Sequence, residues 1–543
     1  MEDDYTPPTT HPMGELSNLE SNAQKSKESI EKIQCDTFAG LVHVEWDEQA
    51  PVTPIGQLVF FAQFLKTCQL FAPWVIDCPL HYSSPNSPSK EDVLGTLLLA
   101  VLSGQKRYSH ITSIRQDAVN PALLGMKKVL SEDSARRAFQ RIDAKECEIW
   151  QQKHLRKCYE PLLLEKWILD VDTTIKPLYG HQEGAEICYN PSKPGRPAHV
   201  IHTYSMAETR LILDSEVLPG NQQAATYSLP RLIEIIEELP PEQRPSLIRG
   251  DCAFGNEKVL SPLERLGSNY LFKVKLTKKA KILSQFMSKS SDNWVDAGQG
   301  WEGVASGLQL TGWTKERRVV ILRRKLKEKK PKKMAKAEQL NFPFLAFMPG
   351  SDEYEFAMLI TTLEMDILTI AQLYRDRATS ENHFDELKRQ WGWGGFVTQD
   401  LKRSQIMARI VAQIYNWWTL FARWINPEKH AEAITSKPLM LYGVGREANH
   451  AGQKTIRITP MHGKFKENCE KVGFISSILN KIKSVAEHFS PIEIWKRVLS
   501  LIFIKFLKGR ILGDGNWSET WWRERGLFIN SAGPSKIAMG ITT

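Results

Sequence analysis

The spacing of hydrophobic residues changes along the chain and predicts several kinds of element. Apolar residues recur at helical spacing over 90–157, where LGTLLLAVL from Leu94 is typical of a buried helix. Over 166–275 the spacing becomes that of strands. KWILDVDTTI, HVIHTYSM and RLILDSEVL predict three consecutive antiparallel strands, and a helix, a strand, a helix and a strand follow them. This order predicts a mixed α/β sheet.

A second stretch with strand character separates this sheet from a long helical segment. Residues 277–353 contain WVDAGQGWEGVASGLQLTGWTKERRVVILRRKL, which alternates and is rich in Gly and Trp, so we expect mainly β structure. Residues 367–391 contain neither Gly nor Pro and predict one long helix. After residue 400 the chain is helical again, and the apolar helix from Leu401 is expected to back the sheet.

Composition narrows the class of protein only to a limited extent. The chain has 543 residues, of which 42% are hydrophobic, and its formal charge of +9 permits a polyanionic partner without proving one. The eight cysteines form no CxxC pair and no set with zinc spacing, which favours reduced thiols in an intracellular protein. The N-terminus lacks a signal-peptide pattern, and the apolar runs are shorter than the roughly 20 residues that a bilayer requires. We therefore expect a cytoplasmic protein with no membrane partner.

The helical region before the sheet ends in a basic segment. LSEDSARRAFQRI begins with Ser131 as a plausible helix cap and carries Arg136, Arg137 and Arg141. Short helices with a basic last member suit a helix-turn-helix-like DNA reader. A structural bundle with a solvated basic face explains the same pattern, and the sequence leaves both open.

Four side chains of complementary chemistry share one face of the helix predicted over 367–391. Tyr374, Arg377, Glu381 and Lys388 lie within about 60° of one another around an ideal helix axis. A phenol, a guanidinium, a carboxylate and an ammonium on one stripe suit a surface that holds a metal ion and phosphate oxygens together. The alternative is a solvated face on which Arg377 pairs with Glu381 across one turn.

Further carboxylates are predicted at strand positions upstream. Asp170 and Asp172 alternate along the first strand and therefore face one side, and Asp251 follows the end of the fourth strand. Each alone is more typical of a turn. With Glu381 they supply acids from three elements, and such clustering costs stability unless cations neutralise it. Hard oxygen ligands favour Mg²⁺ or Mn²⁺ over zinc.

The motifs together resemble a known family. Tyr374, Arg377, Glu381 and Lys388 fill the signature Y-x2-R-x3-E-x6-K, LDVDTT fits a first motif of Asp followed by Thr, and RGDCAF fits a second motif R-x-D-x-x-F. The segment YGHQEGAEICYNPSKPGRPAH resembles a stretch of one subgroup. Over residues 90–420 the chain resembles the DDE transposases of bacterial insertion sequences, in the insertion-sequence-four-like superfamily with the Tyr-Arg-Glu-Lys signature.

The resemblance implies a fold and a mechanism. It implies an RNase H-like mixed sheet core, interrupted by a mainly β insertion, with helical N-terminal and C-terminal regions. Asp172, Asp251 and Glu381 would hold two Mg²⁺ ions per active site, with Mn²⁺ as a substitute, for phosphoryl transfer without a nucleotide cofactor. The D-x-T pattern favours Asp172 as the first acid, with Asp170 as an additional or alternative ligand. If Glu381 is not the third acid, Asp385 on the same stripe is the next candidate.

The same resemblance implies DNA as the partner. The protein would cut double-stranded DNA at the terminal inverted repeats of its element and join the ends to target DNA, as a homodimer in the synaptic complex. Arg377 and Lys388 would bind phosphates, and Tyr374 would orient one. Lys193 and Arg196 are further candidates for contact with DNA phosphate, with turn formation as the alternative role. Candidates for base stacking, with core packing as the alternative role, are Trp294, Trp301 and Trp313.

The predicted organisation has six segments. They are a disordered tail (1–35), a helical N-terminal DNA-binding region (36–157), the first stretch of the catalytic core (158–276), a mainly β insertion (277–353), the second stretch of the catalytic core (354–425) and a C-terminal helical region (426–543). Two other functions stay open, namely a related Mg²⁺-dependent endonuclease without strand transfer and an inactive DNA-binding regulator.

Overall fold

The computed structural model describes residues 33–44, 47, 50–190, 193–290, 292–326, 354–427, 429–459, 462–484 and 489–513, with the backbone alone at 290 and 379–381. The chain divides into two compact units, Met1–Pro51 and Val52–Thr543. In the first, β1 (Ile33–Thr37) and β2 (Gly40–Val44) form an antiparallel hairpin. Ile33–Cys35, which the sequence assigned to the tail, therefore belong to a strand, and the rest of that predicted tail lies outside the described residues.

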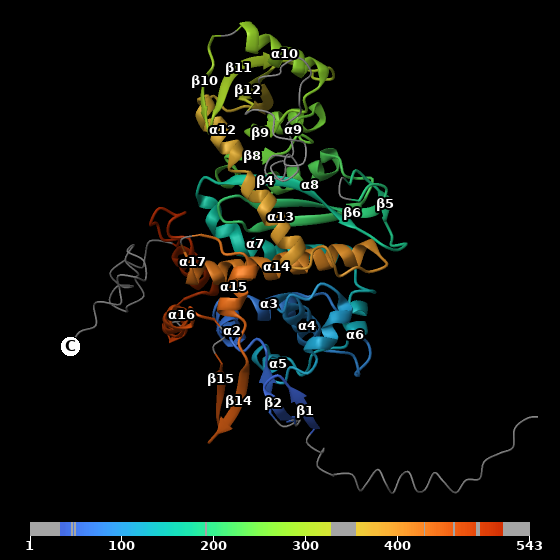
Figure 1. Cartoon of the computed structure of the whole chain (residues 1–543), viewed down its shortest axis with the longest axis vertical. Helices are drawn as coiled ribbons and strands as arrows, with labels where there is room; N and C mark the ends of the chain where they lie inside the picture. Colours follow the sequence, from blue (N-terminus) through green and yellow to red (C-terminus); the bar gives the residue numbers. More distant parts are fainter. Residues whose placement is uncertain are drawn as a thin grey trace, which may run out of the picture. The chain divides into compact units, whose positions relative to one another are not determined.

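A mixed sheet forms the centre of the second unit (Figure 1). β4 (Ile168–Pro177), β6 (Pro197–Met206) and β7 (Ile212–Pro219) are consecutive and antiparallel, as predicted. The short β5 (Glu186–Ile187) also pairs with β6. β8 (Leu247–Gly250) and β9 (Tyr270–Lys273) run parallel to β4. The mixed α/β prediction is confirmed.

Helices connect these strands in the predicted order. α8 (Ala225–Glu237) joins β7 to β8, with the 3-10 turn η3 (Pro241–Gln243) after it, and α9 (Glu257–Arg265) joins β8 to β9. α8 and α9 pack on each other. The loop from β8 to α9 covers residues 251–256 and contains Asp251.

The segment that follows β9 extends the same sheet. After α10 (Lys278–Ser290), the strands β10 (Val295–Gly298), β11 (Trp301–Leu308) and β12 (Arg317–Lys325) form a meander. β13 (Tyr354–Thr361) pairs with β12 on one side and with β9 on the other. The strand character predicted here is found, and the boundaries 277–353 of a separate insertion domain stay a prediction.

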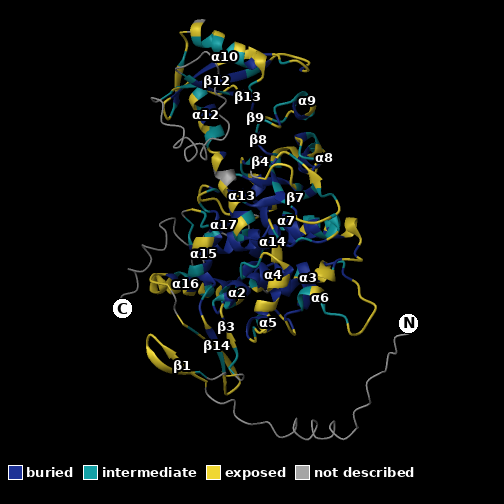
Figure 2. Ribbon diagram, turned by 45° about the vertical axis from the view of Figure 1, so that its right-hand side comes forward, coloured by how far each residue is buried: buried dark blue, intermediate teal, exposed yellow. Residues whose placement is uncertain are grey.

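One long helix supports the sheet from behind. α14 (Leu401–Ile425) is buried along most of its length and packs on β7 and on α7 (Ala144–Tyr159), which the 3-10 turn η2 (Glu160–Leu164) follows (Figure 2). The Asn416 side chain accepts a hydrogen bond from the Ile212 N–H and donates one to the Ile212 carbonyl, so it replaces a strand neighbour at that edge. The expectation that the helix from Leu401 backs the sheet is confirmed.

The residues before the sheet are helical after a short strand. After β3 (Val52–Thr53) come α2 (Leu58–Thr67), α3 (Phe71–Asp77), α4 (Lys90–Leu102), the 3-10 segment η1 (Tyr108–Ile114), α5 (Asn120–Leu123) and α6 (Glu132–Arg137). Ser131 caps α6 by accepting from the Ser134 N–H, as predicted. Within the residues that the structure describes, no single helix has the length and apolarity to cross a membrane; α2 and α3 meet such a criterion only as a pair bent by 67°.

The C-terminal residues are not wholly helical, which corrects the sequence expectation. α15 (Ala433–Met440), α16 (Phe465–Ser484) and α17 (Pro491–Ile502) are helices, but β14 (Gly445–His450) and β15 (Gln453–Ile458) form a hairpin that also pairs with β3. The hairpin turns at Ala451 and Gly452, both with positive φ. A two-residue turn of this kind usually carries Asn-Gly, so the Ala-Gly pair gave little signal.

The long helix predicted over 367–391 is two helices. α12 (Ile367–Arg375) and α13 (Ala378–Gln390) are separated by Asp376 and Arg377. The Arg377 N–H donates to the Tyr374 carbonyl at 3.1 Å, a tighter step than the helical one. The prediction of one continuous helix is therefore wrong, because the helix is interrupted at Asp376 and Arg377. The ideal-helix angles between Tyr374 and the later residues do not apply across this break.

Candidate active site

Two acids from neighbouring parallel strands lie level with each other. The register pairs Asp170 of β4 with Arg249 of β8, so two residues further along Asp172 faces the position of Asp251. Adjacent strands are about 4.8 Å apart. The sheet therefore brings together two carboxylates that are far apart in sequence.

Asp170 and Asp172 have different partners, although they share a strand face. Both carboxylate oxygens of Asp170 accept from Arg249, at 2.7 and 2.8 Å, and the pair is almost fully buried. The same guanidinium donates to the Leu373 carbonyl of α12 at 2.6 Å. Arg249 thus joins β4, β8 and the helix that carries Tyr374, and Asp170 neutralises its charge.

The loop that carries Asp251 is held by local hydrogen bonds. Asp251 Oδ1 accepts from the Ala253 N–H at 2.9 Å, and Asn256 Nδ2 donates to the Ala253 carbonyl at 2.7 Å. Phe254 is buried against Phe272 of β9. Asp251 is therefore fixed at the carboxyl end of β8, where ligand sites of such sheets tend to lie.

Arg377 enters the site from the junction of α12 and α13. Its Nη2 donates to Asp172 Oδ2 at 2.6 Å, while Asp172 Oδ1 accepts from the Thr173 N–H at 2.7 Å. The Arg377 side chain is 4% exposed and that of Asp172 16%. The sequence left open that Arg377 pairs with Glu381 on a solvated face. The guanidinium is instead buried beside Asp172.

The electrostatics place Tyr374 and Asp251 in the same cluster. Burial raises the pKa of Tyr374, and the charges of Asp251 and Asp172 raise it further while Arg377 opposes them. Burial lowers the pKa of Arg377, but the negative charges of Asp172 and Asp251 outweigh this and raise it overall. Two carboxylates, a phenol and a guanidinium therefore act on one another at close range.

Lys388 of α13 completes this set from the next helix. Burial lowers the pKa of Lys388, while the charges of Asp172 and Asp385 work in the opposite direction. Asp385 itself lies on the exposed side and pairs with Arg389 at 2.7 Å. Glu381 lies on α13 between Arg377 and Lys388, but its side chain lies outside the described residues.

The donor set suits a hard divalent cation. Among the described side chains, no group of three His, Cys, Asp or Glu is arranged to hold a metal ion. Asp172 and Asp251 supply oxygen donors that are only partly buried, which fits Mg²⁺ or Mn²⁺. Glu381, which the sequence predicts as the third acid, is on α13, and Lys388 of the same helix lies near Asp172.

The end of α13 is anchored by residues that the sequence analysis did not select. Lys176, on the same face of β4 as Asp172, is buried and donates to the Gly395 carbonyl at 2.5 Å. Glu386 accepts from Trp391 at 3.1 Å and lies 2.7 Å from His430 Nε2. The period-two alternation of β4 already placed Lys176 on the acidic face, whereas the partners of Glu386 had no sequence signal.

Trp391 and Trp393 close the end of α13. Both are buried, and Trp393 Nε1 donates to the Ala408 carbonyl of α14 at 2.9 Å. Gly395 lies so close to the Lys106 carbonyl that a Cβ atom there would be 1.8 Å from it. The position of α13 over the acids therefore depends on β4, α14 and the N-terminal region together.

The other candidate DNA contacts lie in separate places. Lys193 and Arg196 are on the connection from β4 to β6, where both cations lie over the exposed ring of Tyr179, at 4.8 and 4.9 Å from its centroid. Their contact with DNA stays a prediction.

The three candidate stacking tryptophans each have an arginine of β12 over the ring. The pairs are Arg323 over Trp294, Arg324 over Trp301 and Arg317 over Trp313, at 3.9, 4.9 and 5.3 Å. Trp301 and Trp313 are also buried. Stacking on a base would require these arginines to move, and it stays a prediction.

Asp172 on β4 and Asp251 after β8 therefore form one cluster with Tyr374 of α12 and with Arg377 at the junction of α12 and α13. The chain belongs to the transposase DDE domain group 1 family, whose model matches residues 84–441. It is therefore a DDE transposase by family.

The other comparisons add little to this assignment. A solved structure described as a piggyBac transposase synaptic complex with hairpin DNA matches at 12% identity over 90% of this chain and 94% of that chain, with a TM-score of 0.35. A score of this size is too low to equate the two folds. No curated protein matches the chain.

Proposed function

We propose that this protein is the transposase of a bacterial insertion sequence of the Tyr-Arg-Glu-Lys type. It cuts double-stranded DNA at the terminal inverted repeats and joins the ends to target DNA. The observation that carries the proposal is the meeting of Asp172, Asp251, Tyr374 and Arg377, which come from three segments of the family-matched region. A bacterial cytoplasmic location and a synaptic homodimer belong to the same proposal.

The topology of the central strands supports an RNase H-like core. The order β7-β6-β4-β8-β9, with β6 antiparallel to its neighbours and β8 and β9 parallel to β4, is the observation that supports the RNase H-like core we propose. In this arrangement the first acid lies on the central strand and the second follows its parallel neighbour. Asp172 and Asp251 occupy these positions.

Asp172 is the first catalytic acid in this proposal, and Asp170 is a positioning residue. Asp170 has both oxygens on Arg249, so using it as a metal ligand would leave a buried guanidinium without its partner. Asp172 is more exposed and meets Arg377 through a single oxygen. With Asp251 and Glu381, it would hold two Mg²⁺ ions.

Bound divalent metal would supply an activated water or 3′-hydroxyl and would stabilise the leaving oxygen. The chain's own residues then position the DNA. Arg377 and Lys388 bring positive charge to Asp172 and would bind phosphate oxygens beside the scissile bond. Tyr374 remains protonated because its pKa is raised, so its hydroxyl can donate to a phosphate.

The test uses the purified protein and a plasmid that carries the gene with its natural flanking DNA. We expect Mg²⁺-dependent cleavage at the ends of the element by the wild type and none by Glu381→Gln. Asp385→Asn is the matched control, since Asp385 is an exposed carboxylate on the same helix. Cleavage by Glu381→Gln at the wild-type rate would show that Glu381 is not the third acid.

The same reactions separate the alternative functions. Products in which the cleaved ends are joined to a second plasmid support a transposase. Cleavage without joining would indicate an endonuclease, and binding of the ends without cleavage would indicate a regulator.

A further inference from the structure

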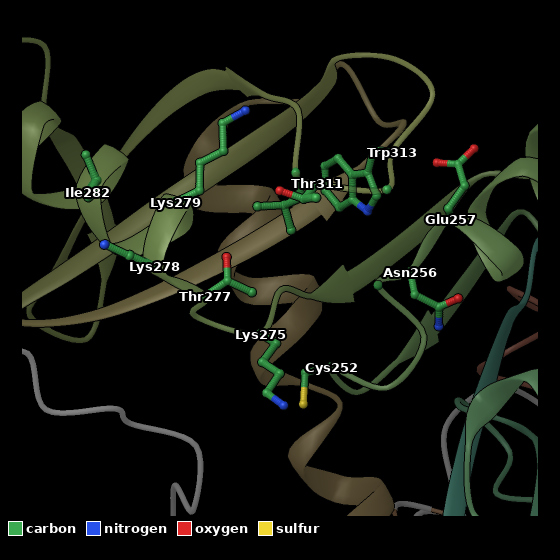
Figure 3. Close-up of a pocket in the computed structure, with 13 residues that line it drawn as sticks. Cys252, Asn256, Glu257, Lys275, Thr277, Lys278, Lys279, Ile282, Thr311 and Trp313 are labelled. Atoms are coloured by element: carbon green, nitrogen blue, oxygen red, sulfur yellow. The ribbon is translucent and has the colours of Figure 1, made fainter.

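A pocket of about 580 Å³ begins at Cys252, the residue after Asp251 (Figure 3). Three segments build its walls: the loop after β8, the residues from the end of β9 into α10, and the loop between β11 and β12. The pocket thus lies between the second acid and the strands that extend the sheet. The roles proposed above for the acids and the helix residues do not use it.

The walls are held in place by polar contacts. Thr314, next to the pocket wall at Trp313, donates through its backbone N–H and its hydroxyl to Glu257 of α9, at 3.2 and 2.7 Å. Arg317 of β12 pairs with Glu257 and with Glu264, both at 2.7 Å. A Cβ on Gly255 would lie 2.8 Å from the Lys273 carbonyl, so glycine allows the loop to approach β9. The pocket is therefore a built feature of the fold.

The residues that line the pocket carry more positive than negative charge. Lys275, Lys278 and Lys279 line it and are exposed. Among the lining residues, all of which the structure describes, Glu257 is the one acid. Its hydrogen bond with Arg317 lowers its pKa to about 2. Arg317 also pairs with Glu264, which has a second ion pair with Lys315 at 3.1 Å, so two cations other than the pocket lysines offset these two acids.

The other residues that line the pocket suit a ligand larger than a free ion. Ile282 of α10 lines the pocket and is 55% exposed, and Thr277 and Asn256 add hydrogen-bonding groups. In Figure 3, Lys275 and Cys252 lie close together, and Cys252 directly follows Asp251 in the chain. Ammonium groups attract the anionic phosphates of a nucleic-acid strand, and the apolar wall beside them suits the uncharged sugars that join these phosphates.

We propose that this pocket binds the phosphodiester backbone of one DNA strand as it leaves the acids at Asp251, with Lys275 and Lys278 contacting phosphates. The inference rests on the proposed function and assigns the path of its substrate. Inorganic phosphate or a free nucleotide offers the same anionic chemistry, so the experiment compares these sources.

The experiment measures binding of a fluorescent duplex with the natural end of the element to the full chain over a salt series. The double variant Lys275→Ala with Lys278→Ala should reduce the slope of log affinity against log salt by about 1.4–1.8, since each phosphate contact contributes about 0.7–0.9. Lys289→Ala, an exposed lysine of α10 outside the pocket, is the control and should leave the slope unchanged. Replacing Lys275 and Lys278 by Arg should retain it. A double Ala variant with the wild-type slope would overturn the assignment.

Competition tests the source of the phosphate. Inorganic phosphate or deoxyadenosine monophosphate, at the phosphate concentration of the DNA, should not displace the duplex from the wild type. Displacement that depends on Lys275 and Lys278 would make the pocket a general phosphate site and overturn its assignment to a DNA strand.

Cleavage in the same samples separates the pocket from the proposed function. If the slope depends on the two lysines but the wild type does not cut in Mg²⁺, the function fails and the pocket assignment stands. If the wild type cuts and the double Ala variant binds and cuts like it, the pocket assignment fails and the function stands.

Discussion

Arg377 and Asp172 form a buried ion pair of 2.6 Å across 205 positions of sequence. Each charge offsets the cost of burying the other. Because Arg377 stands at the junction of α12 and α13, the pair fixes that junction against β4. The helix that carries Glu381 is thereby positioned by an interaction with Asp172, the first acid in our proposal.

Removing the Arg377 charge should impair cleavage and stability together. Arg377→Met leaves Asp172 without its buried partner, which typically costs about 3–5 kcal/mol. We expect the free energy of unfolding in urea to fall by about that amount, and the cleavage rate at saturating DNA to fall by about a hundredfold or more. Arg389→Met, which removes an exposed arginine of α13, is the control and should change neither quantity much. A cleavage rate within about threefold of wild type for Arg377→Met would contradict a role beside the phosphate.

Asp170 and Asp172 should respond differently to the same substitution. Asp170→Asn breaks the buried bidentate pair with Arg249, so we expect the free energy of unfolding to fall by about 3 kcal/mol or more. Asp172→Asn leaves the buried Arg377 guanidinium without its partner, so we expect a comparable loss of stability, but it alone should abolish Mg²⁺-dependent cleavage by protein that is still folded. Urea unfolding and plasmid cleavage measure the two effects. The reverse pattern would make Asp170 the first acid.

His154 should make the protein less stable in acid. Burial lowers the pKa of His154 to about 4 from a usual 6.5, although its hydrogen bond with Asp77 opposes the shift. The unfolded chain therefore binds more protons between these values, and the free energy of unfolding falls by up to about 1.4 kcal/mol per pH unit as the pH drops from 6.5 toward 4. His154→Gln should remove this contribution to the slope in urea titrations between about pH 4.5 and pH 7. An unchanged slope would show that His154 titrates normally.

Lys176 should make the protein more stable as the pH rises in the basic range. Burial lowers its pKa to about 8 from 10.5, so the unfolded chain binds more protons between these values. The free energy of unfolding should rise as the pH increases from about 8 toward 10, by at most about 1.4 kcal/mol per unit for this group. Burial also lowers the pKa of Lys437, to about 7, so Lys437 makes its own contribution to the pH dependence of the free energy of unfolding. The difference between wild type and Lys176→Met therefore isolates Lys176, and equal slopes would contradict the prediction.

Local patterns determined most of the elements. The strands around Asp172, the helices α8 and α9, the helix from Leu401 and the Ser131 cap all follow from side-chain periodicity and capping, which act over a few residues. Spacing also selected Tyr374, Arg377 and Lys388. Where a pattern was weak, as at the Ala451-Gly452 turn, the hairpin was missed.

Tertiary structure decided which of these side chains meet. Sequence could not separate Asp170 from Asp172, because both face one side of β4; the fold pairs the first with Arg249 and the second with Arg377. It also splits the predicted helix at Arg377 and buries Lys176 against Gly395. These outcomes depend on contacts between residues distant in sequence, and the energy of a charge depends on its burial and its partners, which no local pattern encodes.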